Sequence, residues 1–261
     1  MQGTSVPNHN LIFQGLLAER IPPITSALEA RLARDYGSIF ITTATPPPCI
    51  VFRDEQQVRE FQSSVAISQH TLGEYPIELQ TVAMEALIAA AEQASRDGVS
   101  ITARAADAGR RSYGDTVGLW LRNVEQGLDH WVTAGRIDPG QADRVRRLPL
   151  SDQVETILNM EDTSELYFGT YFDRSILYSV AAPGSSQHLS LLAFDVKEYK
   201  DLSVEQALNE HGWYRTVVND LPHFTYLGRT ETVLSKLGLK QDVRKHDGQV
   251  YRFWVPDLGQ G

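Results

Sequence analysis

His188, Asp195 and His223 are the residues whose types and surroundings best fit a metal site in this sequence. Asp195 directly follows the apolar run 191–194 (LLAF), where a buried carboxylate without a partner would be costly. Two imidazoles and one carboxylate form a zinc ligand set that leaves a fourth position open for water. The three residues therefore predict a catalytic zinc site. The alternative is that Asp195 accepts hydrogen bonds from backbone amides and that both histidines are ordinary core residues.

The spacing of these residues sets conditions on the site. Residues seven apart on a regular strand face opposite sides, so His188 and Asp195 can share a metal only if the chain bends between them. We expect this bend near Ser190. Asp220 lies three residues before His223 and is a candidate general base. Asp220 would take a proton from a zinc-bound water molecule, whose pKa zinc lowers to about 7.

These segments resemble the D-alanyl-D-alanine carboxypeptidases and dipeptidases of the VanY and VanX type, which are relatives of the hedgehog zinc proteins. The signature of that family has Ser-x-His, then Ala-x-Asp ending seven residues after the His, and later Glu-x-x-His before a strand. The matching segments here are 186–188 (SQH), 193–195 (AFD) and 220–223 (DLPH). The family's arginine motif before a helix is matched by 108–112 (AGRRS), and the resemblance covers roughly residues 78–230.

The resemblance implies zinc-dependent hydrolysis of peptide bonds in bacterial cell-wall peptides. The substrate would be a peptidoglycan stem peptide or a D-Ala-D-Ala-like dipeptide, and Zn²⁺ would be held by the three ligands named above. Asp220 takes the place of the family's catalytic Glu. Arg111 takes the place of the family's arginine, which stabilises the developing oxyanion or holds the substrate. Ser186 is expected to orient the substrate or a ligand.

Three positions depart from the family pattern, because Leu191 replaces Gly, Asp220 replaces Glu and Pro222 replaces Trp. The Asp side chain is one methylene shorter, so it must lie closer to the water or act through a second water. This difference motivates an alternative function, a zinc-containing but non-catalytic module that binds peptidoglycan peptides. A third alternative is a metal-free domain whose N-terminal region serves a partner.

Helical patterns come first in the chain and strand patterns come later. Helices are predicted at 22–35, 76–98 and 112–133, with a strand at 99–104. Several strands are predicted in the last hundred residues, including 166–172 (LYFGTYF) and 175–180 (SILYSV). This order predicts an α+β fold in which helices pack on an antiparallel sheet that carries the zinc site. We interpret residues 1–75 as an N-terminal extension packed on the core, with a loosely structured start at 1–20. Residues 76–261 would form the zinc peptidase-like catalytic domain.

Composition limits the classes of partner. The formal net charge of −9 argues against nucleic acid as a partner. The sequence contains no run of about 18 apolar residues, so we expect no membrane span. The first twenty residues do not have the pattern of a signal peptide. Because a wall peptidase acts outside the cytoplasmic membrane, we expect a periplasmic or exported protein, with a cytoplasmic location as the alternative. The single cysteine, Cys49, is interpreted as a small buried residue.

Overall fold

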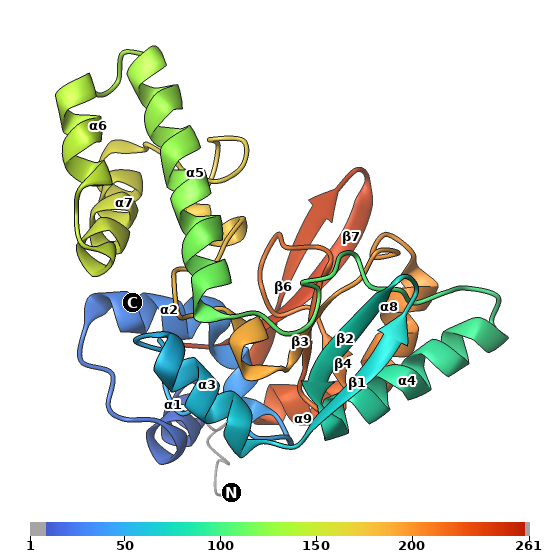
Figure 1. The fold of residues 1–261 in the computed structure, drawn as a ribbon. Coiled ribbons are helices and arrows are strands. Elements are labelled where there is room, and N and C mark those ends of the chain that lie inside the picture. The colour runs from blue at the N-terminus through green and yellow to red at the C-terminus, as the bar shows by residue number, and fades with distance from the viewer. Residues whose placement is uncertain (1–8, 259–261) are drawn as a thin grey trace, which may run out of the picture.

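The computed structural model of this chain describes residues 9–258. It combines helices with three small antiparallel sheets, so the expected mixture of helices and antiparallel strands is confirmed. In Figure 1 three helices stand together on one side and the strands lie on the other. These helices are α5 (Tyr113–Thr133), α6 (Pro139–Arg146) and α7 (Leu150–Ser164). We call residues 113–182 the helical arm.

The sheet closest to the predicted site has three strands in the order β3-β5-β4. They are β3 (Ala193–Asp195), β4 (Trp213–Tyr214) and β5 (His223–Tyr226). Phe194 lies opposite Phe224, and both side chains are fully buried. Burial of this aromatic pair favours the observed register, because a slip of one strand by one residue would turn its ring to the other face. The same register sets Asp195 directly opposite His223.

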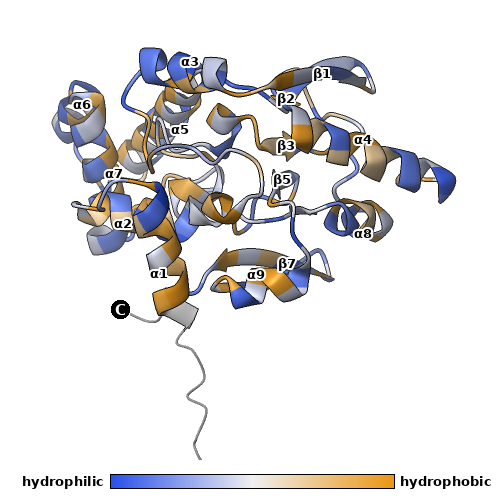
Figure 2. Cartoon of the chain, turned by 90° about the horizontal axis from the view of Figure 1, so that it is seen from below, coloured by the Kyte–Doolittle hydropathy of each residue, from blue (hydrophilic) through white to orange (hydrophobic). Residues whose placement is uncertain are grey.

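The main hydrophobic core surrounds this sheet and includes buried residues of helices α4 (Thr81–Arg96) and α8 (Leu202–Glu210), which contact each other. Helix α1 (His9–Arg20) adds Phe13 and Leu17 to the same core, and Figure 2 shows this helix as largely hydrophobic. The expected loose structure is therefore wrong for residues 9–20, because burial of these side chains holds the helix in place. Residues 1–8 lie outside the described part of the chain.

A β-hairpin precedes α4 where the sequence predicts the start of a helix. It consists of β1 (Ile67–Leu72) and β2 (Tyr75–Gln80), paired in antiparallel register. Ile77 and Leu79 are buried, while the alternate residues Pro76 and Glu78 are more exposed. This period of two indicates a strand, and the predicted helix at 76–98 is wrong over its first five residues. The hairpin also pairs residues on both sides of position 75, the predicted boundary between the N-terminal extension and the catalytic domain.

The predicted strands at 166–172 and 175–180 are wrong. The chain forms turns there and a short 3₁₀ helix, η2 (Ile176–Tyr178). The buried carboxylate of Glu161 on α7 accepts hydrogen bonds from the backbone N–H groups of Phe168 and Ile176, at 3.0 and 2.7 Å. These amides are therefore satisfied by a side chain and need no strand partner. Phe168 and Ile176 fill a second core inside the helical arm.

The helical arm is built around α5, which begins and ends close to the predicted bounds. Ser112 caps the helix by accepting from the N–H of Asp115, and the Asp115 carboxylate accepts from the N–H of Ser112, which completes a capping box. Gly127 permits close packing, because a Cβ there would lie 2.2 Å from the ring of Phe168. Helix α2 (Ala27–Tyr36) contributes Leu32 to the arm's core and contacts strand β7 (Gln249–Pro256), so it connects the arm to the rest of the molecule.

The remaining elements include two buried 3₁₀ helices, η1 (Gly37–Ile41) and η3 (Gln187–Ser190). The others are α3 (Glu55–Ser64), α9 (Glu231–Lys236), β6 (Leu239–His246) and β7. The strand expected at 99–104 is reduced to a single bridge between Ala103 and Val196. Among the described helices, none is both long enough and apolar enough to cross a membrane.

Candidate metal centre

A left-handed residue supplies the bend that the sequence requires between the first two ligands. His188 lies in the 3₁₀ helix η3, and Leu191 ends that helix with φ 59° and ψ 30°. A left-handed conformation costs a non-glycine residue roughly 1–2 kcal/mol. The Leu191 side chain is fully buried, and that burial is worth about as much. The bend expected near Ser190 is therefore built at the next residue, and it turns His188 toward the end of β3.

The three predicted ligands come together. Asp195 Oδ1 lies 3.3 Å from His188 Nε2 and 3.2 Å from His223 Nδ1. All three ligand atoms lie within 4.8 Å of one another, and both imidazoles are buried. Across residues 9–258, this is the one group of three such side chains close enough to hold a metal ion.

The hydrogen bond of His188 fixes which ring nitrogen carries the proton. Nδ1 lies 2.7 Å from the carbonyl oxygen of Gly109, which can only accept, so Nδ1 is protonated. Burial, followed by the positive charge of Arg111, lowers the pKa of His188 to about 4, so the ring is neutral near pH 7. Its buried Nε2 has no hydrogen-bond partner and presents a lone pair to Asp195. Their 3.3 Å contact is therefore not a true ion pair.

His223 has a matching arrangement. Its Nε2 lies 2.9 Å from Gln187 Oε1, and the Gln187 amide nitrogen donates to the carbonyl of Tyr36 at 2.8 Å. The second bond fixes the orientation of the amide, so His223 Nε2 must be the donor to Gln187. Thr216 and Thr225 donate to the same Gln187 oxygen. The Nδ1 of His223 can then face the Asp195 carboxylate only with a proton or a cation between them.

The donor atoms fit a divalent metal. Two imidazole nitrogens and one carboxylate oxygen point at one place, and the orphaned Nε2 of His188 leaves that place unsatisfied by the protein alone. Each imidazole has its other nitrogen fixed by an oxygen, at Gly109 for His188 and at Gln187 for His223. Such outer partners orient the histidines that bind metals in proteins. The group His188, Asp195 and His223 could therefore hold a metal ion.

Arg111 is placed against the metal centre, but its side chain is engaged. Its Nη2 donates to Asp195 Oδ2 at 2.7 Å, and its Nε donates to the backbone carbonyl of Asp107 at 3.1 Å. The Arg111 side chain is mostly buried, with 15% of its surface exposed. It therefore neutralises the second oxygen of the ligand carboxylate, a contact that the sequence did not indicate.

Asp220 and Ser186 both line the cavity beside the three ligands. Burial raises the pKa of Asp220 to about 6, and the nearby charge of Asp195 acts in the same direction. A carboxylate with a pKa near 6 is well suited to take and return a proton near neutral pH. The hydroxyl of Ser186 has no hydrogen-bond partner among the described residues, so it is available to a ligand.

This metal-site cavity has a volume of about 400 Å³ and is partly open to solvent. Residues of the helical arm, including Leu119 and Val180, form part of its wall. Arg104, Asp107 and Arg111 add charge to its lining. A cavity of this size suits a small molecule or a few peptide residues.

Arg215 is a positioning residue that the sequence did not single out. It is fully buried, and it donates to the carbonyls of Leu221 at 2.8 Å and Tyr199 at 2.6 Å. Its guanidinium also lies over the ring of Phe224, 4.4 Å from the centroid. Since Leu221 follows Asp220, Arg215 holds the loop that carries the candidate base. The one sequence feature that indicates burial of Arg215 is its position inside an aromatic segment, 213–218 (WYRTVV).

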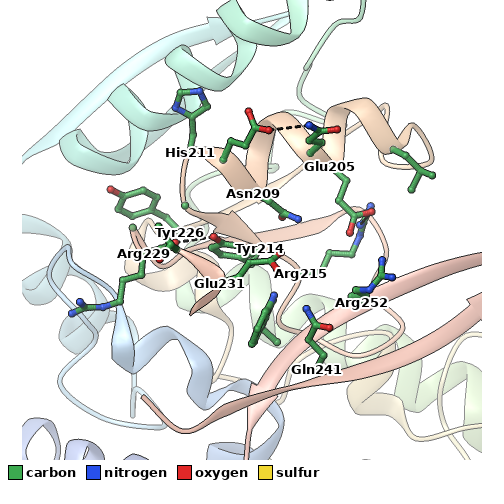
Figure 3. Close-up of a pocket in the computed structure, with 17 residues that line it drawn as sticks. Glu205, Asn209, His211, Tyr214, Arg215, Tyr226, Arg229, Glu231, Gln241 and Arg252 are labelled. Carbon is green, nitrogen blue, oxygen red and sulfur yellow. Dashed lines mark hydrogen bonds and ion pairs between the residues drawn. The ribbon is translucent and has the colours of Figure 1, made fainter. Parts of the chain in front are cut away.

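A second, larger cavity lies away from the metal centre. Its volume is about 1020 Å³, and Figure 3 shows Arg215, Glu205 and Arg252 among its lining side chains. An ion pair joins Arg215 to Glu205 at this wall. The cavity contains none of the three ligands, and size alone therefore does not mark the metal centre.

The chain was compared with models of protein families, with curated proteins and with solved structures. None of the three comparisons finds a match.

Proposed function

We propose that this protein is a zinc-dependent peptidase of bacterial cell-wall peptides, similar in action to the D-alanyl-D-alanine carboxypeptidases. The observation that supports this most is the convergence of two imidazole nitrogens and one carboxylate oxygen beside a cavity that also contains Asp220. The order and spacing of the ligands, which resemble those of that family, point to the same substrate class.

The residues that would hold zinc are His188, Asp195 and His223. A bound zinc ion would supply Lewis acidity, which activates a water molecule and polarises the scissile carbonyl. Three protein ligands leave a coordination position open, as catalytic zinc sites require.

The protein's own groups would carry the proton transfers. Asp220, with its pKa raised to about 6, would accept the proton of the attacking water and pass one to the leaving amine. Ser186 would donate a hydrogen bond to the bound peptide from the cavity wall. Arg111 would act chiefly by holding the Asp195 carboxylate, since its guanidinium is already bonded there. The assignment of Arg111 to the oxyanion stays a prediction.

The experiment is hydrolysis of N-acetyl-L-lysyl-D-alanyl-D-alanine by the zinc-loaded protein, measured as release of D-alanine. We expect release by the wild type and at least a hundredfold less by His223→Ala. The matched control is His70→Ala on strand β1, which removes an exposed histidine and should leave the rate unchanged. Equal rates for the wild type and His223→Ala would contradict the proposal.

The second candidate is a zinc-containing module that binds the same peptides without cleaving them. The hydrogen bond between Arg111 and Asp195 favours this candidate, because it occupies the arginine expected to stabilise the oxyanion. Arg104 is then the remaining arginine of the described cavity lining. Peptide binding by the zinc-loaded protein with no release of D-alanine over a long incubation would support this candidate.

A further inference from the structure

Arg104 places a positively charged side chain in the lining of the metal-site cavity. Its exposed side chain lines the cavity, and it makes no hydrogen bond or ion pair with any residue in the range 9–258. The guanidinium lies over the ring of Tyr199, 5.8 Å from the centroid. Arg111, the other arginine of the cavity, is bonded to Asp195 and Asp107. Arg104 therefore provides the uncommitted positive charge of this lining.

The backbone fixes Arg104 beside the metal ligands. Its N–H donates to the backbone carbonyl of Asp195 at 3.0 Å. The preceding residue, Ala103, forms a bridge with Val196, the residue after that ligand. Ala103 and Val196 are both buried, so this attachment belongs to the core. The base of the Arg104 side chain is thus held one strand away from Asp195, while its guanidinium stays accessible.

The acidic residues of the cavity form no ion pair with Arg104. Asp107 and Asp195 are both paired with Arg111, and the positive charge of Arg104 acts on Asp220 only without direct contact. The guanidinium retains its donors, whose planar arrangement matches a carboxylate. A ligand that enters beside the metal centre would meet these donors.

We propose that Arg104 determines specificity by binding a carboxylate of the substrate next to the scissile bond. This inference rests on the proposed peptidase function. The carboxylate comes from one of two sources, the free C-terminus of the peptide or an acidic side chain near it. In both cases Arg104 donates two parallel hydrogen bonds, and a neutral amide in place of the carboxylate loses the charge-assisted part of the interaction.

The test is equilibrium binding of matched peptides to zinc-loaded protein by calorimetry, in an Asp220→Asn background that preserves the peptides. The first pair is N-acetyl-D-alanyl-D-alanine and its C-terminal amide. The second pair consists of two C-terminal amides, one with D-glutamate and one with D-glutamine at the last position. We expect the acid of at least one pair to bind about five- to tenfold more tightly than its neutral partner. Arg104→Ala should reduce this ratio to about one.

The matched control is Arg96→Ala, which removes an exposed arginine at the end of α4, outside the cavity lining. It should keep the ratio of the unsubstituted background. The inference is overturned if both pairs bind with a ratio of one before Arg104 is changed, or if Arg104→Ala keeps the ratio. Hydrolysis by the wild type separates the two proposals. Discrimination without hydrolysis would sink the peptidase function alone, and hydrolysis without dependence on Arg104 would sink this inference alone.

Discussion

Asp195 is the residue that joins the parts of the candidate metal centre. One of its carboxylate oxygens faces both imidazoles, and the other accepts a hydrogen bond from Arg111. Because both oxygens have partners, the carboxylate can lie at the end of an apolar strand without a large cost of burial. The buried Nε2 of His188 has no hydrogen-bond partner, and a bound cation would satisfy its lone pair.

The sequence indicated some residues of the candidate site and missed others. His188, Asp195 and His223 were recognisable because ligand chemistry depends on residue type and spacing. Gln187 and Arg215 were missed because their roles depend on partners that are distant in sequence, such as Tyr36 for Gln187 and Tyr199 for Arg215. A polar residue of unremarkable type has no pattern that indicates such contacts before the fold is known.

Substitution of Asp220 tests the candidate base at this scale. Asp220→Asn keeps the size of the side chain but removes its ability to take a proton. We expect kcat for D-alanine release to fall by about 100-fold or more, because general-base catalysis typically contributes that much. Zinc content should not change, since Asp220 is not one of the three ligands. Undiminished kcat at normal zinc content would show that another group is the base.

Glu161 acts at the scale of the elements, because it decides the conformation of the segment after α7. Its carboxylate accepts from the N–H groups of Phe168 and Ile176 and from the hydroxyl of Ser175. The aromatic and β-branched residues of that segment are typical of a strand, and this pattern could not indicate that a carboxylate on the preceding helix would accept the hydrogen bonds of its backbone amides. By contrast, α5 was predictable because its capping box lies within four neighbouring residues, Ser112 to Asp115.

Removal of Glu161 should destabilise the helical arm. Glu161→Ala leaves two backbone N–H groups unsatisfied in a buried place, so we expect a loss of about 3 kcal/mol in the free energy of unfolding. Glu161→Gln keeps an accepting oxygen and should cost about 1 kcal/mol or less. Urea denaturation followed by circular dichroism measures both. Equal stability of the alanine variant and the wild type would contradict this role.

The same residue makes a pH prediction. Burial raises the pKa of Glu161 in the folded state, in spite of its hydrogen bonds. The folded state then holds its proton to a higher pH than the unfolded state does, so stability falls as pH rises from the unfolded pKa to the raised one. We expect the wild type to lose stability relative to Glu161→Gln across that interval. A constant difference between the two proteins from pH 4 to pH 8 would contradict the expectation.

At the scale of the whole molecule, the helical arm and the sheet region meet at the metal-site cavity. The ligands come from η3, β3 and β5, whereas Leu119 on α5 and Val180 after η2 belong to the arm. The hydroxyl of Tyr36 on α2 donates to the carbonyl of Leu177 at 2.6 Å, which fastens the arm beside the centre. The arm should therefore shape what the cavity admits without contributing to metal binding.

A pair of leucine substitutions on α5 separates these roles. Leu119→Trp places a larger side chain in the cavity wall and should lower kcat/KM for the acetylated tripeptide about tenfold or more. Leu121→Trp is the control, because Leu121 lies two residues away with 43% of its surface exposed. Both variants should bind zinc like the wild type. Equal kcat/KM for the two variants would show that the arm does not limit access.

The central claim, that His188, Asp195 and His223 form one metal centre, is tested most directly by metal content. Purified wild type, His188→Ala and the control His70→Ala are incubated with zinc, dialysed and measured by elemental analysis, with the thermal midpoint as a second readout. We predict one zinc per chain and a raised midpoint for the wild type and His70→Ala, because zinc binds only the folded centre. His188→Ala should retain no zinc and gain no stability from it. Equal zinc in His188→Ala and wild type, or none in the wild type, would contradict the account.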